Sequence, residues 1–400
     1  MRGDEGGNMN FGTTKEEEQF RERLGNFLDR ELTEEIARQN WEDRGVGPEA
    51  REFSRKLAAN GFLGMSWPKE YGGQGLSPAY DFIVIDELGR RWGAHIPLDV
   101  GYTMVGHTIL RRGSEKLKKE FLPRIIRGEI EFCLGYTEPN AGSDLASMKM
   151  RAVEKGNDYI LNGQKTFNTV AHYADYHWVA ARTDFSPDVP KHRGISLFIV
   201  DMNSPGVTVR PLRTMSGEQT NEVFYENVRV GRPRLVGEKN KGFYYMMEAI
   251  DSERNHVFTP FRLLPLLEEL ILYARETKFM GKPLAEDPVI RDRLAQAAME
   301  LEVAQVLADH SRWMESNEIP MTYEPEITKV FVSELEQRLV DTGMQILGHY
   351  GQLEEGSKWV PLRGRIEWYF LHSFMTTIGA GTSEIGRNVI AQRGLGLPRS

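Results

Sequence analysis

The residue best suited to acid–base chemistry is a glutamate on the apolar face of an expected helix. That helix begins near Gly242, and at about 100° per residue Glu253 falls in the middle of its apolar stripe, while Glu248 and Asp251 point away. The stripe consists of Met246, Ile250 and Val257, and Phe243 and Ala249 flank it. A carboxylate on such a face is unusual because burying its charge is costly. Burial also raises the pKa of a carboxyl group, which suits a general base near neutral pH.

Ion pairing is the competing explanation for Glu253. Arg254 follows it directly and Arg262 lies further along the chain, and either could neutralise a buried carboxylate. A glutamate paired in this way would be structural. The residues alone leave both explanations open.

Two glycine-bearing segments could bind a flat or anionic ligand. TEPNAGSD at 137–144 is small and polar and lets backbone amides approach a ligand closely, although an ordinary turn also explains it. GAGTS at 379–383 opens an expected helix, and free helix N–H groups attract anions. A simple N-cap is the alternative for the second segment.

The elements that carry these residues change character twice along the chain. Residues 14–128 show helical periodicity, residues 131–236 form strand-like runs, and residues 241–395 return to long helical periods. This order predicts an α+β fold in separate domains rather than alternating strands and helices. No Gly-x-Gly-x-x-Gly follows a strand, which argues against a dinucleotide-binding Rossmann domain.

Several local expectations follow from the same patterns. A helix is expected over 16–38, and another is expected to end at Gly61. The stretch YILNGQK at 159–165 predicts a hairpin with Asn162 and Gly163 at the turn. Strands are expected at 178–181, 195–200, 207–209 and 222–228.

Composition narrows the class of protein. The 400 residues suit two to three domains, and Cys133, the one cysteine, excludes a disulfide framework and fits a reducing compartment. A net charge of -8 argues against nucleic-acid binding, and no apolar run reaches the ~20 residues that span a bilayer. Residues 1–10 lack the features of a targeting signal, and Met9 is a candidate start. We therefore expect a cytoplasmic protein with no membrane insertion and no metal.

Four segments resemble motifs of the acyl-CoA dehydrogenase family. In chain order they are WPKEYGG at 67–73, TEPNAGSD at 137–144, LNGQK at 161–165 and GTSEIGRNVIA at 381–391. Four matches in the right order are far more specific than any one of them. The resemblance implies an N-terminal all-α domain over 11–130, a middle β-barrel domain over 131–240 and a C-terminal four-helix-bundle domain over 241–400. It also implies FAD as cofactor and usually a tetramer.

The resemblance assigns roles to individual residues. Glu253 and Arg254 match the acid–Arg pair that supplies the base in one branch of the family, since Ala380 stands where many members carry the catalytic glutamate. Arg254 is thereby expected to help order the substrate site, and Ser143 to lie between flavin and substrate. The expected FAD contacts are Tyr136, Thr137, Gly142, Ser143, Phe167, Thr169, Gln345, Gly348, Thr382 and Glu384. A core position is the alternative for Phe167.

Two expected FAD contacts depart from the family pattern. Thr277 replaces an arginine that would meet the neighbouring subunit's pyrophosphate, and Met280 replaces a phenylalanine of the same element. His349 stands where a glycine would approach a phosphate, so it either adds positive charge or blocks the contact, unless it has no role there. These changes resemble those of sterol-degrading relatives that form α2β2 heterotetramers.

The expected reaction is the α,β-desaturation of an acyl-CoA thioester in the β-oxidation of fatty acids. Glu253 removes the α-proton, the β-hydride passes to flavin N5, and an electron-transfer flavoprotein takes the electrons. The expected assembly is a homotetramer or dimer, with α2β2 left open. A flavin monooxygenase on the same fold and an FAD-poor partner subunit are the alternatives.

Overall fold

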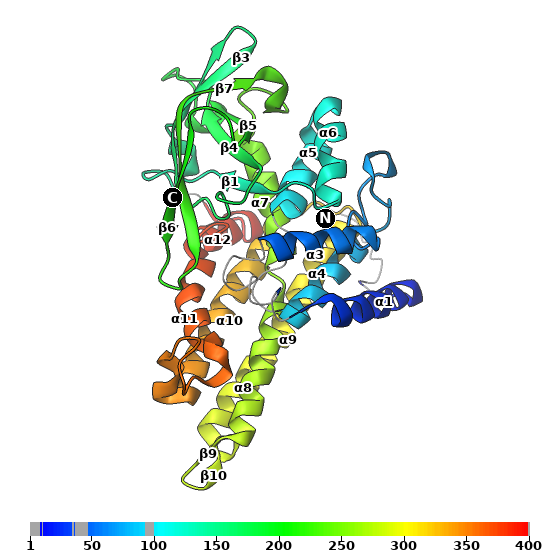
Figure 1. The fold of residues 1–400 in the computed structure, drawn as a ribbon, viewed down its shortest axis with the longest axis vertical. Helices are drawn as coiled ribbons and strands as arrows, with labels where there is room; N and C mark the ends of the chain where they lie inside the picture. The colour runs from blue at the N-terminus through cyan, green and yellow to red at the C-terminus, as the bar shows by residue number, and fades with distance from the viewer. Residues whose placement is uncertain (1–8, 10, 34–35, 37–46, 93–99, 399–400) are drawn as a thin grey trace.

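Helices surround one end and one side of a single large sheet in the computed structural model of this chain, which describes residues 9, 11–33, 36, 47–92 and 100–398 (Figure 1). Blue and cyan N-terminal helices lie beside the green sheet. The C-terminal helices extend away from it as an elongated bundle, and α7, Gly242–Val257, connects the sheet to that bundle. The expected α+β fold, with a sheet between two helical domains, is confirmed.

The N-terminal region is helical, as its periodicity predicts. Its α-helices are α1 Lys15–Glu31, α3 Pro48–Ala59, α4 Pro78–Trp92, α5 His107–Arg112 and α6 Glu115–Ile126, with a π-helical turn at Gly101–Gly106. Thr14 caps α1 through a capping box with Glu17. The helix expected over 16–38 ends at Glu31, and most of the rest of that range lies outside the described residues. The expected end near Gly61 is confirmed, because α3 stops at Ala59 and Gly61 has a φ of +73°.

The middle region forms one eight-stranded sheet in the order β6-β7-β3-β2-β4-β5-β8, with β1 paired to β4. The pairs β1–β4 and β2–β4 are parallel, and the other pairs are antiparallel. The strands are β1 Phe132–Gly135, β2 Arg151–Lys155, β3 Asp158–Lys165, β4 Tyr176–Arg182, β5 Ile195–Asp201, β6 Val207–Arg213, β7 Gln219–Gly231 and β8 Leu235–Val236. All four runs expected as strands lie within β4, β5, β6 and β7.

The hairpin predicted at Asn162 and Gly163 is wrong. Strand β3 runs through both residues, and its pairing with β7 shifts register between Leu161 and Gly163. Gly163 has a φ of +146°, and a Cβ there would lie 2.9 Å from the Cα of Met150. The glycine therefore serves a β-bulge under close packing rather than a turn, a distinction that the Asn-Gly pair alone cannot make.

Both faces of the sheet are buried at β4, which explains its unbroken apolar run. Trp178 and Ala180 join the core shared with the N-terminal helices and α7, whereas Val179 and Ala181 join a second core within the strand region. Successive residues of a strand point to opposite faces, so a strand covered on both sides needs apolar residues at every position.

The C-terminal region is the expected helical bundle. Its elements are α8 Leu264–Glu276, the short hairpin β9 Lys278–Phe279 with β10 Lys282–Pro283, α9 Pro288–Ser316, α10 Glu324–Leu347, α11 Arg365–Thr376 and α12 Ser383–Val389. One apolar core, which includes Leu270, Ala304, Leu339 and Tyr369, holds α8, α9, α10 and α11 together. The helices of this bundle extend from the sheet to the opposite end of the molecule (Figure 1).

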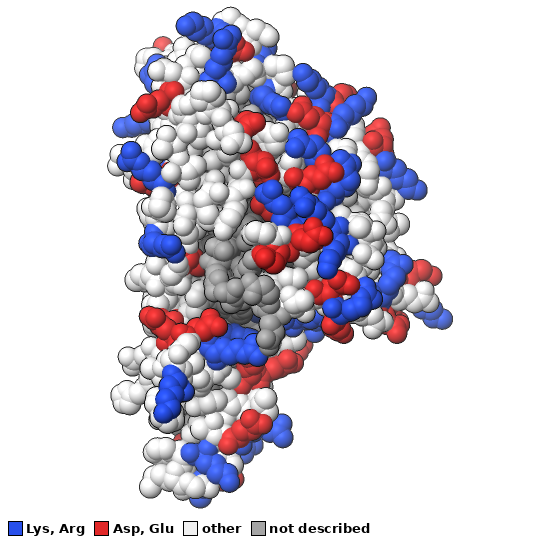
Figure 2. All heavy atoms as spheres, viewed as in Figure 1, with Lys and Arg blue, Asp and Glu red and all other residues white. Residues whose placement is uncertain are grey.

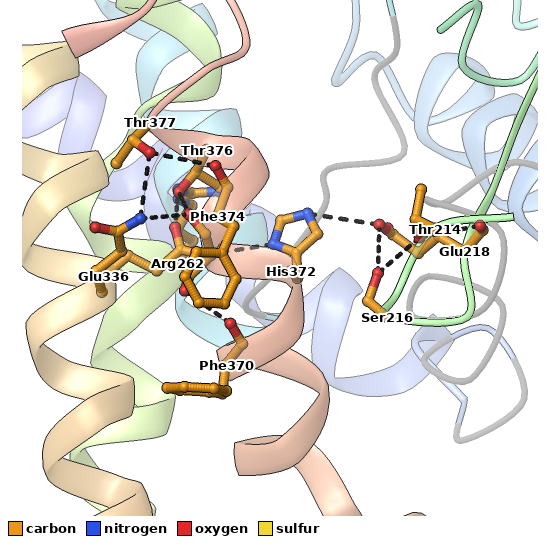
Figure 3. Close-up of polar contacts among 12 residues, drawn as sticks. Thr214, Ser216, Glu218, Arg262, Glu336, Phe370, His372, Phe374, Thr376 and Thr377 are labelled. Carbon is orange, nitrogen blue, oxygen red and sulfur yellow. Dashed lines mark hydrogen bonds and ion pairs between the residues drawn. The ribbon is translucent and has the colours of Figure 1, made fainter.

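A buried polar network anchors the β6–β7 connection on this bundle (Figure 3). His372 of α11 lies between Glu336 of α10, at 3.4 Å, and Glu218, at 3.8 Å. Arg262 pairs with the other oxygen of Glu336, and Ser216 donates a hydrogen bond to Glu218 at 3.2 Å. Because buried charges are stable only with partners, this network fixes how the sheet sits on the C-terminal helices.

The surface carries charges of both signs. Figure 2 shows Lys and Arg side chains interspersed with Asp and Glu over the visible face, without a basic stripe. No helix in the described part of the chain is long and apolar enough to cross a membrane. Within the same residues, no group of three or more His, Cys, Asp or Glu side chains could hold a metal ion.

Candidate active site

Helix α7 places Glu253 as its periodicity predicts. Met246 and Ile250 of the apolar stripe are buried, as is the flanking Ala249, and Glu253 is half-buried on the same face. Glu248, on another face, forms an ion pair with Arg112 at 2.5 Å. The same helix therefore places the Glu248 carboxylate at the surface and the Glu253 carboxylate toward the protein interior.

The ion-pair explanation for Glu253 finds no support among the described residues. None of them donates a hydrogen bond to its carboxylate or forms an ion pair with it within 4 Å, and Arg262 pairs with Glu336 instead. Burial raises the pKa of Glu253 to about 7, while the charges of Arg254 and Lys329 oppose that rise. A carboxyl group with this pKa is half ionised at neutral pH and can both accept and release a proton.

All three guanidinium nitrogens of Arg254 interact with other groups of the protein. Its Nε and Nη2 donate to the carbonyl oxygen of Ala380 at 3.0 and 2.7 Å, and its Nη1 lies 2.7 Å from Asp251 and 2.8 Å from Glu326. Ala380 has a φ of +54°, and a Cβ on Gly381 would lie 2.9 Å from Nη2 of Arg254. The arginine therefore fixes the loop at 380–381 next to α7, and any effect on substrate order acts through that loop.

Lys329 is a member of this cluster that the sequence reasoning missed. It is fully buried on α10, and its Nζ donates to the carbonyl oxygen of Gly381 at 2.5 Å. Its charge acts on Glu253. The available signal was a lysine among apolar residues in TKVFV at 328–332, which resembles the signal that singled out Glu253.

The segment after β1 lies near Glu253. Burial and then the charge of Glu253 raise the pKa of Tyr136, whose hydroxyl accepts a hydrogen bond from Trp178 at 2.9 Å. Lys165 donates to the carbonyl oxygen of Tyr136 at 3.1 Å and pairs with Glu138 at 2.9 Å. Tyr136, Ile250 and Ala380 also belong to or pack on one apolar core. Strand β1, α7 and the 380–381 loop thus meet at one place.

The other expected flavin-side residues offer free surface at the end of β3. Phe167 is 62% exposed with a φ of +56°, so the alternative of a core position for this residue is wrong. Thr169 is half-buried, and the buried Oδ1 of Asn168 has no hydrogen-bond partner among the described residues. An exposed aromatic ring on a strained backbone beside an unsatisfied acceptor fits a planar, polar ring such as the flavin of FAD.

The glycine-bearing segment 137–144 combines a turn with open space. Glu138 and Ala141 exchange two backbone hydrogen bonds at 3.0 Å. This part of the segment is therefore the ordinary turn that its sequence also allowed. Thr137 accepts a backbone hydrogen bond from Thr166. Gly142 and Ser143 are exposed beyond the turn, and a Cβ on Gly142 would meet nothing within 4 Å. The turn therefore presents these two residues without covering them.

The terminal motif forms the expected helix start. Thr382 is the N-cap of α12, and its hydroxyl accepts the backbone N–H of Ile385 at 3.2 Å. Glu384 is exposed, and its own backbone N–H and the Thr382 hydroxyl lower the pKa of its carboxyl group. Thr382 directly follows the loop that Arg254 and Lys329 hold.

Gln345 and Gly348 lie at the opposite end of α10 from this cluster. Gln345 is 16 residues beyond Lys329, which is about 24 Å along a helix. Both residues are exposed, as is His349 next to them. Met280, at the tip of the β9–β10 hairpin, is 89% exposed. Within one chain, Gln345, Gly348 and Met280 therefore lie far from Tyr136 and Phe167. Figure 1 shows the end of the bundle that carries the β9–β10 hairpin well apart from β1 and β3.

The raised pKa of Glu253 predicts a pH-dependent stability. In the folded state the pKa is about 7 against an ordinary 4.5, so the unfolded chain ionises first and folding loses stability as pH rises from about 4.5 to 7. The cost is at most about 3 kcal/mol, because Glu253 keeps some solvent exposure. Glu253→Gln is therefore expected to unfold at a higher temperature than the wild type at pH 8 and at nearly the same temperature at pH 5.

Thermal unfolding of the FAD-loaded proteins at several pH values measures this difference. Glu248→Gln is the matched control, because it removes the same charge from the same helix outside the apolar stripe. A Glu253→Gln variant whose unfolding temperature differs from wild type equally at pH 5 and pH 8 would contradict the raised pKa.

Comparison with known proteins covers nearly the whole chain. Residues 14–129, 133–228 and 240–395 match the N-terminal, middle and C-terminal domains of acyl-CoA dehydrogenases. The chain is 34% identical to "Acyl-CoA dehydrogenase FadE26" of Mycobacterium tuberculosis, over 98% of this chain and 100% of that protein.

Two solved structures extend the likeness to three dimensions. A structure described as "Tcur3481-Tcur3483 steroid ACAD" superposes with a TM-score of 0.89 at 33% identity, covering 98% of this chain and 100% of the other. The ChsE4-ChsE5 complex from Mycobacterium tuberculosis gives a TM-score of 0.87 at 34% identity, with the same coverage. All three family domains, in order, and these full-length relatives show that the chain belongs to the acyl-CoA dehydrogenase family of FAD-dependent oxidoreductases.

Proposed function

We propose that this enzyme desaturates an acyl-CoA thioester between its α- and β-carbons, with Glu253 as the base. One observation carries the proposal: a half-buried carboxylate that forms no ion pair with any described residue, and whose pKa is about 7, lies on the helix that holds the 380–381 loop. Ala380, in that loop, has a methyl group that cannot accept a proton. Glu253 is therefore the carboxylate suited to this task near neutral pH.

The residues of the chain have separate tasks in this reaction. A carboxylate oxygen of Glu253 takes the α-proton as the C=C bond forms. FAD, when bound, supplies the redox chemistry by accepting the β-hydride. Arg254 holds the loop through the Ala380 carbonyl, which keeps the site on α7 rigid. The apolar residues around Glu253 exclude water and keep its proton affinity high.

We further propose which residues contact the cofactor and the substrate. The exposed ring of Phe167 would stack on the flavin, Thr169 would donate a hydrogen bond to it, and Ser143 would contact both the cofactor and the acyl-CoA. Arg254 belongs to the substrate site through the loop it holds. The remaining cofactor contacts in this proposal are Tyr136, Thr137, Gly142, Gln345, Gly348, Thr382 and Glu384. Gln345 and Gly348 would act on the FAD of another subunit, because they lie at the far end of α10.

The proposed acyl group is bulky and ring-bearing. Two facts support it: one similar structure is described as a steroid ACAD, and Ala380 leaves space where other members carry a glutamate side chain.

Within a β-oxidation sequence, the product would be an α,β-enoyl thioester. A soluble electron-transfer flavoprotein is the proposed electron acceptor, and the cytoplasm the proposed compartment. Proposed domain limits are residues 11–130, 131–240 and 241–400.

Anaerobic mixing with a panel of acyl-CoAs tests the reaction. The panel contains short linear, long linear, branched and steroid-side-chain thioesters. The flavin absorbance is expected to bleach with the steroid-side-chain thioester at least about tenfold faster than with the linear ones. Chelator is expected to leave the rate unchanged. If NAD(P)H alone reduces the flavin, or if the reduced flavin gives a hydroxylated product with oxygen, the desaturase proposal fails.

A heteromeric partner role is the second candidate function. Thr277, Met280 and His349 depart from the family's FAD contacts, and the similar ChsE4-ChsE5 structure is a complex of two proteins. A homotetramer or dimer that contains FAD would show that the chain assembles and binds its cofactor without a second protein. An α2β2 assembly would require a second protein. The FAD content and mass of the purified protein, alone and with a candidate paralogue, distinguish these assemblies. A colourless protein that gains FAD only in the mixture would favour the partner role.

A further inference from the structure

The cluster around Glu253 contains a buried cation that the reaction scheme does not use. Lys329 is 0% exposed, and its Nζ donates a hydrogen bond to the Gly381 carbonyl oxygen at 2.5 Å. Its Nζ also lies 5.7 Å from the ring centre of Phe258. A lysine is rarely buried so completely, because an ammonium group loses its hydration there.

Two cations hold two successive carbonyl groups of the same loop. Arg254 of α7 binds the carbonyl of Ala380, and Lys329 of α10 binds that of Gly381. Both residues of the loop have positive φ angles, +54° and +97°. Because such a backbone is strained for alanine, the two side chains supply the interactions that keep it in place.

The cations also act on Glu253 from two elements. The charges of Arg254, on the same helix, and of Lys329, on α10, act on Glu253, and the charge of Glu253 acts on Tyr136 after β1. Lys329 is in turn influenced by Arg254, Glu326, Glu253 and Glu334. Burial first, and then Arg254, lower the pKa of Lys329 to about 8, so its ammonium group is mostly charged at neutral pH.

We propose that Lys329 is a positioning residue for proton abstraction: its ammonium group fixes the loop at 380–381 and supplies the positive charge that keeps Glu253 ionised in an apolar site. The proposal rests on the role of Glu253 as the base. Arg254 also lowers the pKa of Glu253, but its guanidinium group is shared with the carboxylates of Asp251 and Glu326. Lys329 donates a hydrogen bond to a neutral carbonyl, and its charge acts on the nearby carboxylates, Glu253 among them.

Three substitutions separate the charge of Lys329 from its hydrogen bond. Lys329→Gln keeps an N–H donor for the Gly381 carbonyl and removes the charge. Lys329→Met removes both, and Lys329→Arg keeps the charge. If Lys329→Met does not fold, the test uses Lys329→Gln, because its side chain still has an N–H donor for the Gly381 carbonyl.

The first measurement is independent of catalysis. Thermal unfolding of the FAD-loaded protein is followed from pH 5 to 9.5 with and without Glu253→Gln, in each Lys329 background. The difference grows as pH rises from the pKa of Glu253 in the unfolded chain to its pKa in the folded protein. The pH at which it levels off, called here the plateau pH, therefore reports the folded-state pKa of Glu253. It is expected near pH 7 in the wild type and in Lys329→Arg, and about one unit higher in Lys329→Gln and Lys329→Met.

The second measurement is the pH profile of flavin reduction by an acyl-CoA that the wild type oxidises. The apparent pKa of this profile is expected to rise by the same amount, about one unit, in the two neutral variants. At pH 7 they should therefore reduce the flavin about fivefold more slowly, with rates approaching the wild type above pH 9.

The outcomes distinguish this inference from the proposed function. An unchanged plateau pH in Lys329→Gln overturns the role of Lys329, even if Glu253→Gln abolishes flavin reduction. A plateau pH that rises without any change in the rate profile overturns the role of Lys329 in proton abstraction and shows that Glu253 is not the base. A loss of rate that is equal at every pH would identify a structural role only, and would also overturn the proposal.

Discussion

Glu253→Gln is expected to slow flavin reduction by acyl-CoA by about 10²–10⁴-fold, the contribution of a well-placed general base. Glutamine keeps the size of the side chain and its polarity but cannot accept the α-proton. Acyl-CoA should still bind and perturb the flavin spectrum, because Arg254 and the 380–381 loop are untouched. Anaerobic stopped-flow absorbance on the FAD-loaded variant measures both effects.

The double variant Glu253→Gly with Ala380→Glu is the complementary test. It moves the carboxylate from α7 to the loop that Arg254 holds. Part of the rate lost in Glu253→Gly alone should return, because both positions would then address the same α-proton. A Glu253→Gln rate within threefold of wild type, per folded and FAD-loaded subunit, would show that another group is the base.

Arg254→Met is expected to destabilise the folded protein by about 3–5 kcal/mol. The substitution leaves Glu326, which is 3% exposed, without its one ion-pair partner among the described residues. It also frees the Ala380 carbonyl and Asp251. Breaking a buried pair is costly because the remaining charge stays in the protein interior. Thermal or urea unfolding of the FAD-loaded protein measures the loss.

The control for this prediction is the double variant Arg254→Met with Glu326→Gln. Removing the second charge should restore much of the lost stability, because a neutral pair of similar volume carries little desolvation cost. If the single variant loses less than about 1 kcal/mol, Glu326 is not held by Arg254 in solution. A double variant less stable than the single one would point to packing of the arginine side chain instead of charge.

The placement of Glu253 could be predicted from the sequence because helical periodicity is local. Sixteen consecutive residues form α7, and their spacing alone decides which side chains share a face. The change from helices to strands and back likewise follows from local patterns, which is why the α+β order was predicted correctly. The Asn162-Gly163 prediction failed for the same reason: the local signal for a turn resembles that for a bulge, and only pairing with β7 and contact with Met150 decide between them.

The sequence by itself therefore determined the family, the order of helical and sheet regions and the helix face on which Glu253 lies. Only the tertiary structure decided that Glu253 forms no ion pair within the described part of the chain, that Phe167 is exposed and that Lys329 acts on the site. Arg254 meets Ala380 across 126 residues of sequence, and Lys329 meets Gly381 across 52. The proton affinity of a carboxylate depends on the charges and the burial that surround it in space, and no spacing along the chain encodes contacts this distant.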